Sequence, residues 1–245
     1  KLSPNGSFKW VRQIRTTEQT IGFNQGTSIA TDKKGNSYVI GHFYGETYFH
    51  PIDTTSLITG EFFYGDAFIS KYDSSGNFIW VKVFDGIFTD HGRSVAIDDF
   101  GNIYSCGYFG HSIDLDPGPQ DYIISTTYPI DGYISKLDSN GNFVWGKHIK
   151  CTGELGFDEI DIWNNASIYV SGWFEGSAYI SGNTATITST GDEDGLIIKL
   201  NSSGSYEWHC HLSNLNRSLI SSIDVDNGNN VYATGYFPGK SFIID

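Results

Sequence analysis

The pattern of polar and apolar positions repeats four times along the chain. Each copy opens on Lys, passes through a polar centre that contains Gly, and ends on an apolar segment with Trp. Apolar and polar residues alternate on either side of the centre, which is the period of a strand with one buried face. A short polar segment with Gly between two such runs is typical of a β-hairpin. The copies are KLSPNGSFKW at 1–10, KYDSSGNFIW at 71–80, KLDSNGNFVW at 136–145 and KLNSSGSYEW at 199–208.

A second hairpin is predicted after each Trp. Here an aliphatic residue stands nine positions before a Tyr, as in Val95 and Tyr104, with turn-forming residues between them. The third copy, WNNASIY at 163–169, has no Gly, and we expect Asn164 or Asn165 to take the left-handed conformation there. Each Tyr then leads into a shared segment, namely YVIGHFYG (38–45), YSCGYFG (104–110), YVSGWFEG (169–176) and YATGYFPG (232–239).

These hairpins predict an all-β fold. Trp10, Trp80, Trp145 and Trp208 are spaced 70, 65 and 63 residues apart, and each spacing accommodates four antiparallel strands. Such units are typical of a β-propeller built from four-stranded blades. We therefore expect one array of about four blade repeats of 63–70 residues, with units 1–70, 71–135, 136–198 and 199–245. We expect the four Trp rings to be largely buried between blades.

The two ends of the chain are out of phase with the blades. Residues 1–10 supply the last hairpin of one blade and residues 218–237 the first hairpin of another. Either the two halves meet and close a ring, or the array is a fragment of a larger propeller. Because the chain opens inside a repeat and contains no Met, we expect a processed protein or part of a longer polypeptide.

Composition excludes several classes of partner. With 15 Lys and Arg residues and a net charge of −13, the chain is not expected to bind nucleic acid or an anionic membrane surface. No apolar run is long enough to span a bilayer, so no membrane insertion is expected. The 3 Cys residues cannot all pair within the chain, so disulfides are not expected to form its framework.

The repeat resembles a known family. The run D-[AG]-[FY]-I-S-K-[LY]-D-S-x-G-N-F-x-W at 66–80 and 131–145, the Y-x-x-G-aromatic-F segments, and IDLDPG at 113–118 are similar to the SBBP, or seven-bladed β-propeller-type, repeat of bacterial proteins. The resemblance covers nearly the whole chain. It implies a secreted or cell-surface protein, often a large multidomain chain without assigned chemistry. Asn201, Trp163 and the small number of repeats depart from the family pattern.

One set of equivalent rings could bind a ligand. His42, Tyr108, Trp173 and Tyr236 occupy the same place in the four shared segments. Rings presented by successive blades could stack on sugar faces, or they could pack between adjacent blades, because aromatic side chains bury large apolar areas.

Two groups of residues could hold a metal ion. Asp114 and Asp116 with Asp121 offer the oxygen ligands that Ca²⁺ prefers, although alternate Asp residues are also ordinary turn chemistry. His209 and His211 flank Cys210 on a strand and point to one side, but no third ligand can be identified. Ca²⁺ is thus the cofactor that these residues suggest.

The sequence favours a protein without catalytic activity. It contains no G-x-S-x-G segment, and its 4 Arg residues do not suggest a cluster that binds a substrate carboxylate. We expect an extracellular binding or adhesion scaffold for a glycan or another surface protein. The alternatives are a hydrolase or lyase that acts on polysaccharide, with acids at the central axis, and a passive spacer in a long surface adhesin. Segments 46–65, 111–130 and 177–193 vary between repeats and should emerge on one side as the ligand-binding loops.

Overall fold

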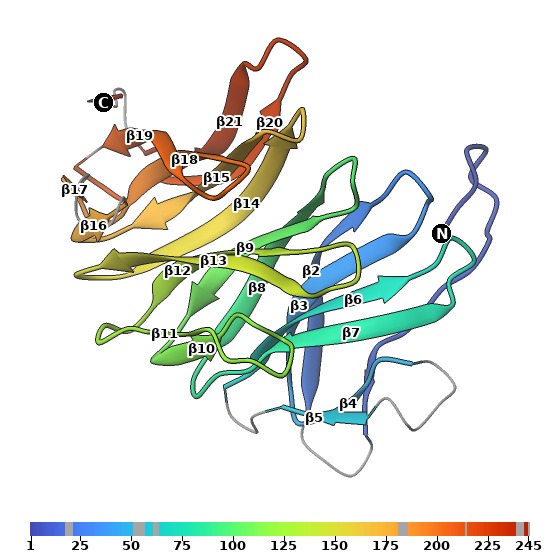
Figure 1. The fold of residues 1–245 in the computed structure, drawn as a ribbon. Coiled ribbons are helices and arrows are strands. Elements are labelled where there is room, and N and C mark those ends of the chain that lie inside the picture. The colour runs from blue at the N-terminus through green and yellow to red at the C-terminus, as the bar shows by residue number, and fades with distance from the viewer. Residues whose placement is uncertain are drawn as a thin grey trace.

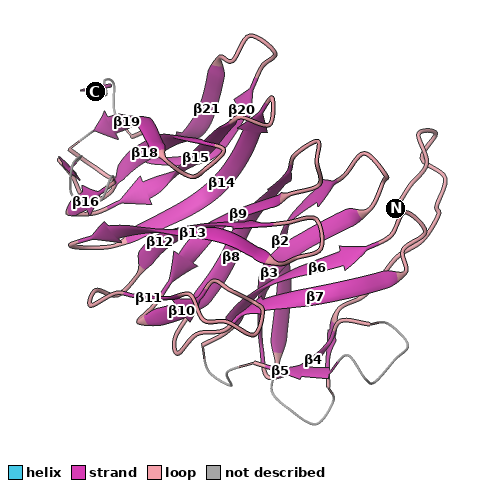
Figure 2. Ribbon diagram, in the orientation of Figure 1, coloured by secondary structure: helices cyan, strands magenta, loops and turns pink. Residues whose placement is uncertain are grey.

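The computed structural model describes residues 1–17, 22–50, 57–60, 64–180, 186–213, 215–238 and 243–244. All regular structure in these residues is β, and Figure 2 shows strands joined by loops. No helix that could cross a membrane occurs in this part of the chain. The sheets fan out as the blades of an open arc (Figure 1), which confirms the all-β, propeller-type fold.

Three blades are complete, and in each the four strands pair antiparallel in chain order. Blade 1 consists of β2 (Phe23–Thr31), β3 (Ser37–Tyr44), β6 (Asp66–Tyr72) and β7 (Phe78–Phe84). Blade 2 consists of β8 (Asp90–Ile97), β9 (Ile103–Phe109), β12 (Asp131–Leu137) and β13 (Phe143–Cys151). Blade 3 consists of β14 (Leu155–Trp163), β15 (Ser167–Phe174), β18 (Asp194–Asn201) and β19 (Tyr206–Ser213).

Incomplete blades flank these three. At one end of the arc, β20 (Leu219–Val225) and β21 (Val231–Tyr236) form a two-stranded sheet. At the other end, residues 1–10 form a hairpin with a bridge between Leu2 and Phe8, followed by β1 (Arg15–Thr16). The two ends lie apart in Figure 1 and share no sheet, so the described residues do not close a ring.

The hairpin turns explain why the polar centres recur. In blade 2 the Asp98 carboxylate accepts hydrogen bonds from the main-chain N–H groups of Phe100 and Asn102, at 3.0 and 2.8 Å. Gly101 follows with φ +84°, a conformation that glycine adopts without steric cost. In the third copy both Asn164 and Asn165 have positive φ, 49° and 59°, and form a two-residue turn in place of the glycine turn.

The glycine of each Y-x-x-G segment is required by a β-bulge in the inner hairpin, which consists of the first and second strands of each blade. In blade 2 the bulge lies between Gly92 and Ser94. The bulge brings the carbonyl oxygen of His91 so close to Gly107 that a Cβ there would lie 1.9 Å from it. The equivalent distances at the other motif glycines are 1.8 Å at Gly41, 2.0 Å at Gly172 and 1.9 Å at Gly235. Only glycine fits at this point of the repeat.

The hydrophobic core lies between blades. The innermost strand β8 packs against β2 on one side and β14 on the other. Ile40 and Phe84 of blade 1 are buried against Phe109 and Tyr133 of blade 2. Tyr104 of blade 2 is buried with residues of blade 3 in the same way. At the end of the arc the equivalent Tyr232 is 59% exposed, because the described residues form no further blade that covers it.

The expectation that the repeated Trp rings are largely buried is wrong. Trp10, Trp80 and Trp145 are half-buried, and Trp208 is 37% exposed. Each of the first three rings lies at the rim against the positive-φ glycine of the next hairpin, as Trp145 does against Gly204. No further copy of the hairpin that runs from Lys through Gly to Trp follows Trp208 within the 245 residues.

Replacing Trp145 by Ala is expected to lower the free energy of unfolding by about 2–3 kcal/mol, less than for a fully buried Trp. The ring contacts Gly204, and its Nε1 donates to Ser202 O at 3.4 Å. Trp208→Ala is the control and should cost about 1 kcal/mol, because no turn glycine of a further Lys-to-Trp hairpin lies against that ring in the described residues. Urea denaturation measures both, and equal losses would contradict the assignment.

Candidate functional site: the loop face

The two faces of the arc differ in the connections that they carry. Tight turns lie on one, here called the turn face, and long variable connections lie on the other, the loop face (Figure 1). The loop-face connections form short hairpins. These are β4 (Glu46–Tyr48) with β5 (Leu57–Thr59), β10 (Ser112–Asp114) with β11 (Ile123–Ser125), and β16 (Ser177–Tyr179) with β17 (Thr186–Thr188). Parts of the segments 46–65 and 177–193 lie outside the described residues.

Each loop-face hairpin is joined to the preceding blade. β16 pairs with the end of β13, β4 pairs with β1, and Ile113 of β10 bridges to Gly86 just after β7. At the last repeat, β22 (Ile243–Ile244) pairs with the end of β19 in the same manner. The variable segments are therefore anchored to a fixed framework.

Aromatic side chains gather on the loop face where blades 1 and 2 meet. The rings of Tyr64 and Phe88 stack with centroids 4.0 Å apart and planes at 21°. Tyr128 lies next to Phe88 along the same cleft. These three side chains are exposed, at 40%, 42% and 44%. A cluster of exposed rings on a buried framework is typical of an interaction site.

Residues 126–128 line two clefts at once. The first cleft is lined by Phe88, His111 and residues 126–129. The second is lined by residues 125–128, Asp131, residues 150–152 and Tyr179. Tyr128 contributes to both clefts, so a molecule bound in either would contact its ring.

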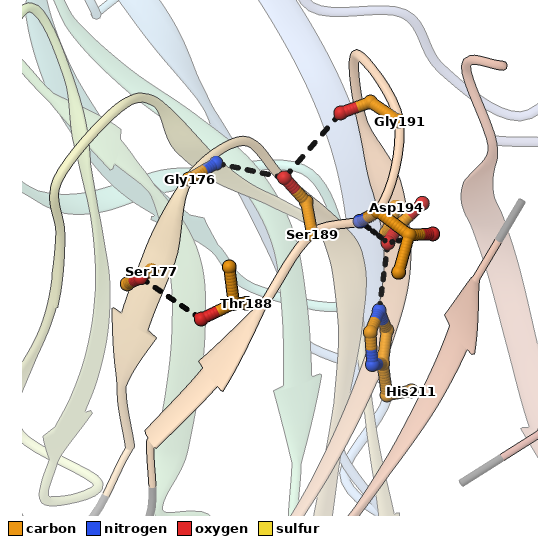
Figure 3. A network of polar contacts seen from close by, with 8 residues as sticks. Gly176, Ser177, Thr188, Ser189, Gly191, Asp194 and His211 are labelled. Carbon is orange, nitrogen blue, oxygen red and sulfur yellow. Dashed lines mark hydrogen bonds and ion pairs between the residues drawn. The ribbon is translucent and has the colours of Figure 1, made fainter. Parts of the chain in front are cut away.

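Buried carboxylates lie beneath the loop face, one at the start of the third strand in each blade. In blade 2 the Asp131 carboxylate lies 2.6 Å from His148 Nε2 and accepts from the Cys151 N–H at 3.0 Å. In blade 3 (Figure 3) the Asp194 carboxylate lies 2.8 Å from His211 Nε2 and accepts from the Thr190 N–H at 2.7 Å. One signal in the sequence points to them, namely an Asp that opens the apolar segments at 66–70, 131–135 and 194–198.

The Asp131, His148 and Cys151 grouping does not contain an activated nucleophile. The Cys151 thiol donates to Glu175 O at 2.8 Å, and burial raises its pKa to about 11. The thiol therefore stays protonated at neutral pH, whereas the nucleophile would be the thiolate. The Asp131 and His148 side chains form a structural pair.

The structure brings together only part of the predicted ring set. His42 is buried and stacks on His91 across the junction of blades 1 and 2, with centroids 3.7 Å apart. The Tyr108 hydroxyl lies 2.7 Å from His91 Nδ1, which adds Tyr108 to this cluster. Trp173 lies against Gly156 within blade 3, and Tyr236 is 56% exposed on the open side of the last hairpin. The sequence did not indicate His91, because Gln25, Gly156 and Leu219 occupy its place in the other repeats.

The stacked imidazoles predict acid sensitivity. Burial, with a smaller effect of Arg93, lowers the pKa of His42 to about 4. Burial, His42 and Arg93 lower the pKa of His91 to about 3. Both values lie below the ordinary pKa of about 6.5, so this contribution to stability is complete above pH 6.5 and is lost as the pH falls towards 4.

We expect the wild type to lose about 2–3 kcal/mol more stability between pH 7 and pH 4 than a variant with His42→Gln and His91→Gln. Denaturant unfolding at the two pH values measures this difference. The same pH dependence in both proteins would contradict the role of the imidazoles.

The predicted metal ligands are engaged in local hydrogen bonds. Asp114 accepts from the N–H groups of Asp116 and Tyr122 at 2.9 and 2.8 Å, and Asp116 accepts from the Gly118 N–H at 2.9 Å. Within the described residues, no three or more His, Cys, Asp or Glu side chains form a group that could hold a metal ion. Asp114, Asp116 and Asp121 are thus not brought together as a ligand set. His209 Nδ1 lies 2.7 Å from the Tyr206 hydroxyl, while His211 pairs with Asp194.

Acidic residues also lie on the inner strands. Asp158 on β14 forms an ion pair with Arg93 on β8 at 2.8 Å. Next to it, Glu159 accepts from the Ser94 hydroxyl at 2.8 Å, and burial raises the pKa of Glu159. Asp158 is thus neutralised, and Glu159 is one of the inner-strand carboxyl groups whose pKa is raised by burial.

Comparison with known proteins shows one distant similarity. The chain is 23% identical over 255 residues to the uncharacterized WD repeat-containing protein L264 of Acanthamoeba polyphaga mimivirus. The alignment takes in 98% of this chain and 14% of the viral protein, so the chain spans a small part of the length of that relative. WD repeats are four-stranded propeller blades, which agrees with the fold. No family model matches the chain, and the SBBP resemblance stays a prediction.

Proposed function

We propose that this chain is a non-enzymatic scaffold that binds another protein through its loop face. The observation that carries the proposal is the cluster of exposed rings formed by Tyr64, Phe88 and Tyr128 beside two clefts. Aromatic side chains held on a rigid framework supply large contact areas at small entropic cost, and they dominate the centres of protein interfaces.

The net charge of the chain indicates which surface charge its partner should have. A net charge of −13 favours a partner whose surface around the contact is basic, because complementary charge steers association. The similarity to a WD repeat-containing protein supports a repeat scaffold, and it does not identify a ligand.

The SBBP resemblance supports a more specific version of this role. In that version the protein is secreted or attached to a cell surface, and its partner is another surface protein or a glycan. Stacked rings such as Tyr64 and Phe88 also suit sugar faces, which keeps a glycan as the second candidate.

Tyr128→Asp is expected to weaken binding at least tenfold, because it places a charge on the segment that lines both clefts. Phe88→Ser should have a similar effect. Partners are first sought on arrays of purified surface proteins and of glycans, and affinities are then measured by biolayer interferometry. Tyr232→Asp is the matched control, since Tyr232 is exposed on the open side of the last hairpin.

Other outcomes would support the alternatives. Binding that survives both loop-face variants would exclude this surface as the site. Polysaccharide turnover that is abolished by Glu159→Gln would favour the hydrolase or lyase. The absence of any partner on either array would favour the passive spacer.

A further inference from the structure

Blade 1 differs from its neighbours at the buried carboxylate of the third strand. Asp66 is buried like its equivalents Asp131 and Asp194. In blades 2 and 3 an imidazole on the fourth strand lies against this carboxylate. The same position in blade 1 is Val83, which packs against a cluster of Phe side chains. The positive group that can balance the carboxylate in the other blades is therefore replaced by an apolar side chain.

A second carboxyl group stands at this place instead. Asp90, the first residue of β8, has no exposed surface, and neither of its carboxyl oxygens has a hydrogen-bond partner among the described residues. The equivalent residues Leu155 and Ser218 carry no charge. A buried carboxyl group without partners is strongly unfavourable, and folded proteins rarely contain one. The burial of Asp90 therefore points to a partner that the described part of the chain does not supply.

The two carboxyl groups meet at Gly86. The Gly86 N–H donates to Asp66 Oδ1 at 3.4 Å. A Cβ on Gly86 would lie 1.6 Å from Asp90 Oδ2 and 2.8 Å from the carbonyl oxygen of Ser112. Because Gly86 has no side chain, oxygens of Asp66, Asp90 and Ser112 can approach one another at this point between the two blades.

The surroundings of Asp90 are negative. Burial, then Asp66 and Asp85, raise the pKa of Asp90 to about 10. The nearby Gly110 N–H lowers the pKa of Asp90 to a smaller extent. Its hydrogen bond goes to Thr89 O, at 3.0 Å. Protonation alone would leave an O–H group for which the described residues offer no hydrogen-bond partner. A positive ion next to the Asp66 carboxylate, in contrast, would satisfy the oxygens of Asp90 and balance the negative charge.

We propose that a hard cation of the calcium type binds between the carboxylates of Asp66 and Asp90 and joins blade 1 to blade 2. The Ser112 carbonyl oxygen supplies a third ligand, because a carbonyl oxygen has two lone pairs and the one hydrogen bond given for it outside the strand pairs of the described residues is from the Ile87 N–H, at 3.2 Å. Carboxylate and carbonyl oxygens are the ligands that such ions prefer. The ion occupies the electrostatic place of the imidazoles of His148 and His211 in the other blades.

Calcium added to chelator-treated protein is expected to raise the melting temperature by at least about 5 °C at saturation, because a ligand that binds only the folded state stabilises it. Isothermal titration should show one site. Asp90→Asn should abolish both the heat and the shift, and in chelator this variant should be about as stable as the wild type, since burial and the neighbouring acids already favour the uncharged form of Asp90 when no cation is bound.

Asp114→Asn is the matched control, because it removes a carboxylate from the loop formerly considered for calcium, and it should bind as the wild type does. Loss of the shift in this control, or its retention in Asp90→Asn, would overturn the proposal. So would a wild type that shows no heat and no shift with calcium, magnesium or sodium, which would indicate that the two carboxyl groups hold only a proton.

Discussion

Alanine in place of Gly107 is expected to destabilise the protein by about 3 kcal/mol or more. The added Cβ would lie 1.9 Å from the His91 carbonyl oxygen, and main-chain atoms on both sides of the contact would have to move. Because this contact lies beside a β-bulge in the middle of the inner hairpin, the bulge cannot relax without disturbing the packing of β8 against its neighbours. Thermal and urea denaturation measure the loss.

Gly228→Ala is the control for this substitution. Gly228 lies in an exposed turn, and the atoms nearest to its Cβ position, at 3.1 and 3.2 Å, belong to the side chains of Asn230 and Asp226. The control should change stability by less than about 1 kcal/mol. An unfolding midpoint of the Gly107 variant close to that of the control would show that the strands are not held in this register.

His148→Val is expected to lower stability by about 3–5 kcal/mol, because it leaves the buried Asp131 carboxylate with the Cys151 N–H as its remaining hydrogen-bond donor. His211→Val should cost less. Asp194 keeps the N–H and the hydroxyl of Thr190, at 2.7 and 3.3 Å (Figure 3). Urea denaturation ranks the two variants.

A double variant checks that the loss comes from an unbalanced carboxylate. Asp131→Val combined with His148→Val removes both members of the pair, and it should recover part of the stability lost by His148→Val alone. If the two substitutions are additive, or if the His211 variant is the less stable of the two, the side chains contribute independently of one another.

The hairpins could be predicted because short-range rules determine them. The Asx turn at Asp98 and the positive φ of Gly101 follow from the local sequence, and the left-handed pair Asn164 and Asn165 was expected from the same rules. The repeat spacing then led to the blade. These features depend on residues that are close together in the chain.

The exposure of the Trp rings could not be predicted in this way. Their recurrence indicated a packing role, but whether a ring is covered depends on a hairpin about 60 residues further along the chain. Trp145 meets the turn that contains Gly204, whereas Trp208 meets none. A repeat pattern shows which positions are equivalent. It does not show whether each position is buried, because burial depends on which blade lies next to it.

The site was predicted only in outline. The segment 111–130 was expected to carry ligand-binding residues, and Tyr128 lies in it, but the stacking of Tyr64 on Phe88 brings together two connections that have no common pattern. His91 and Asp90 were missed for a related reason. Each breaks the repeat at a single position, and its importance depends on a partner in the preceding blade.

The hairpins that join each blade to the one before it have a mechanical consequence. A blade is held to its neighbour near the axis by packed inner strands and at the periphery by main-chain hydrogen bonds, such as those between β13 and β16. Separating two blades therefore requires two distant sets of contacts to break together, so neighbouring repeats should open as one cooperative unit rather than peel away singly. In a polypeptide under tension, the applied force would therefore be distributed over several adjacent blades and not act on one blade alone.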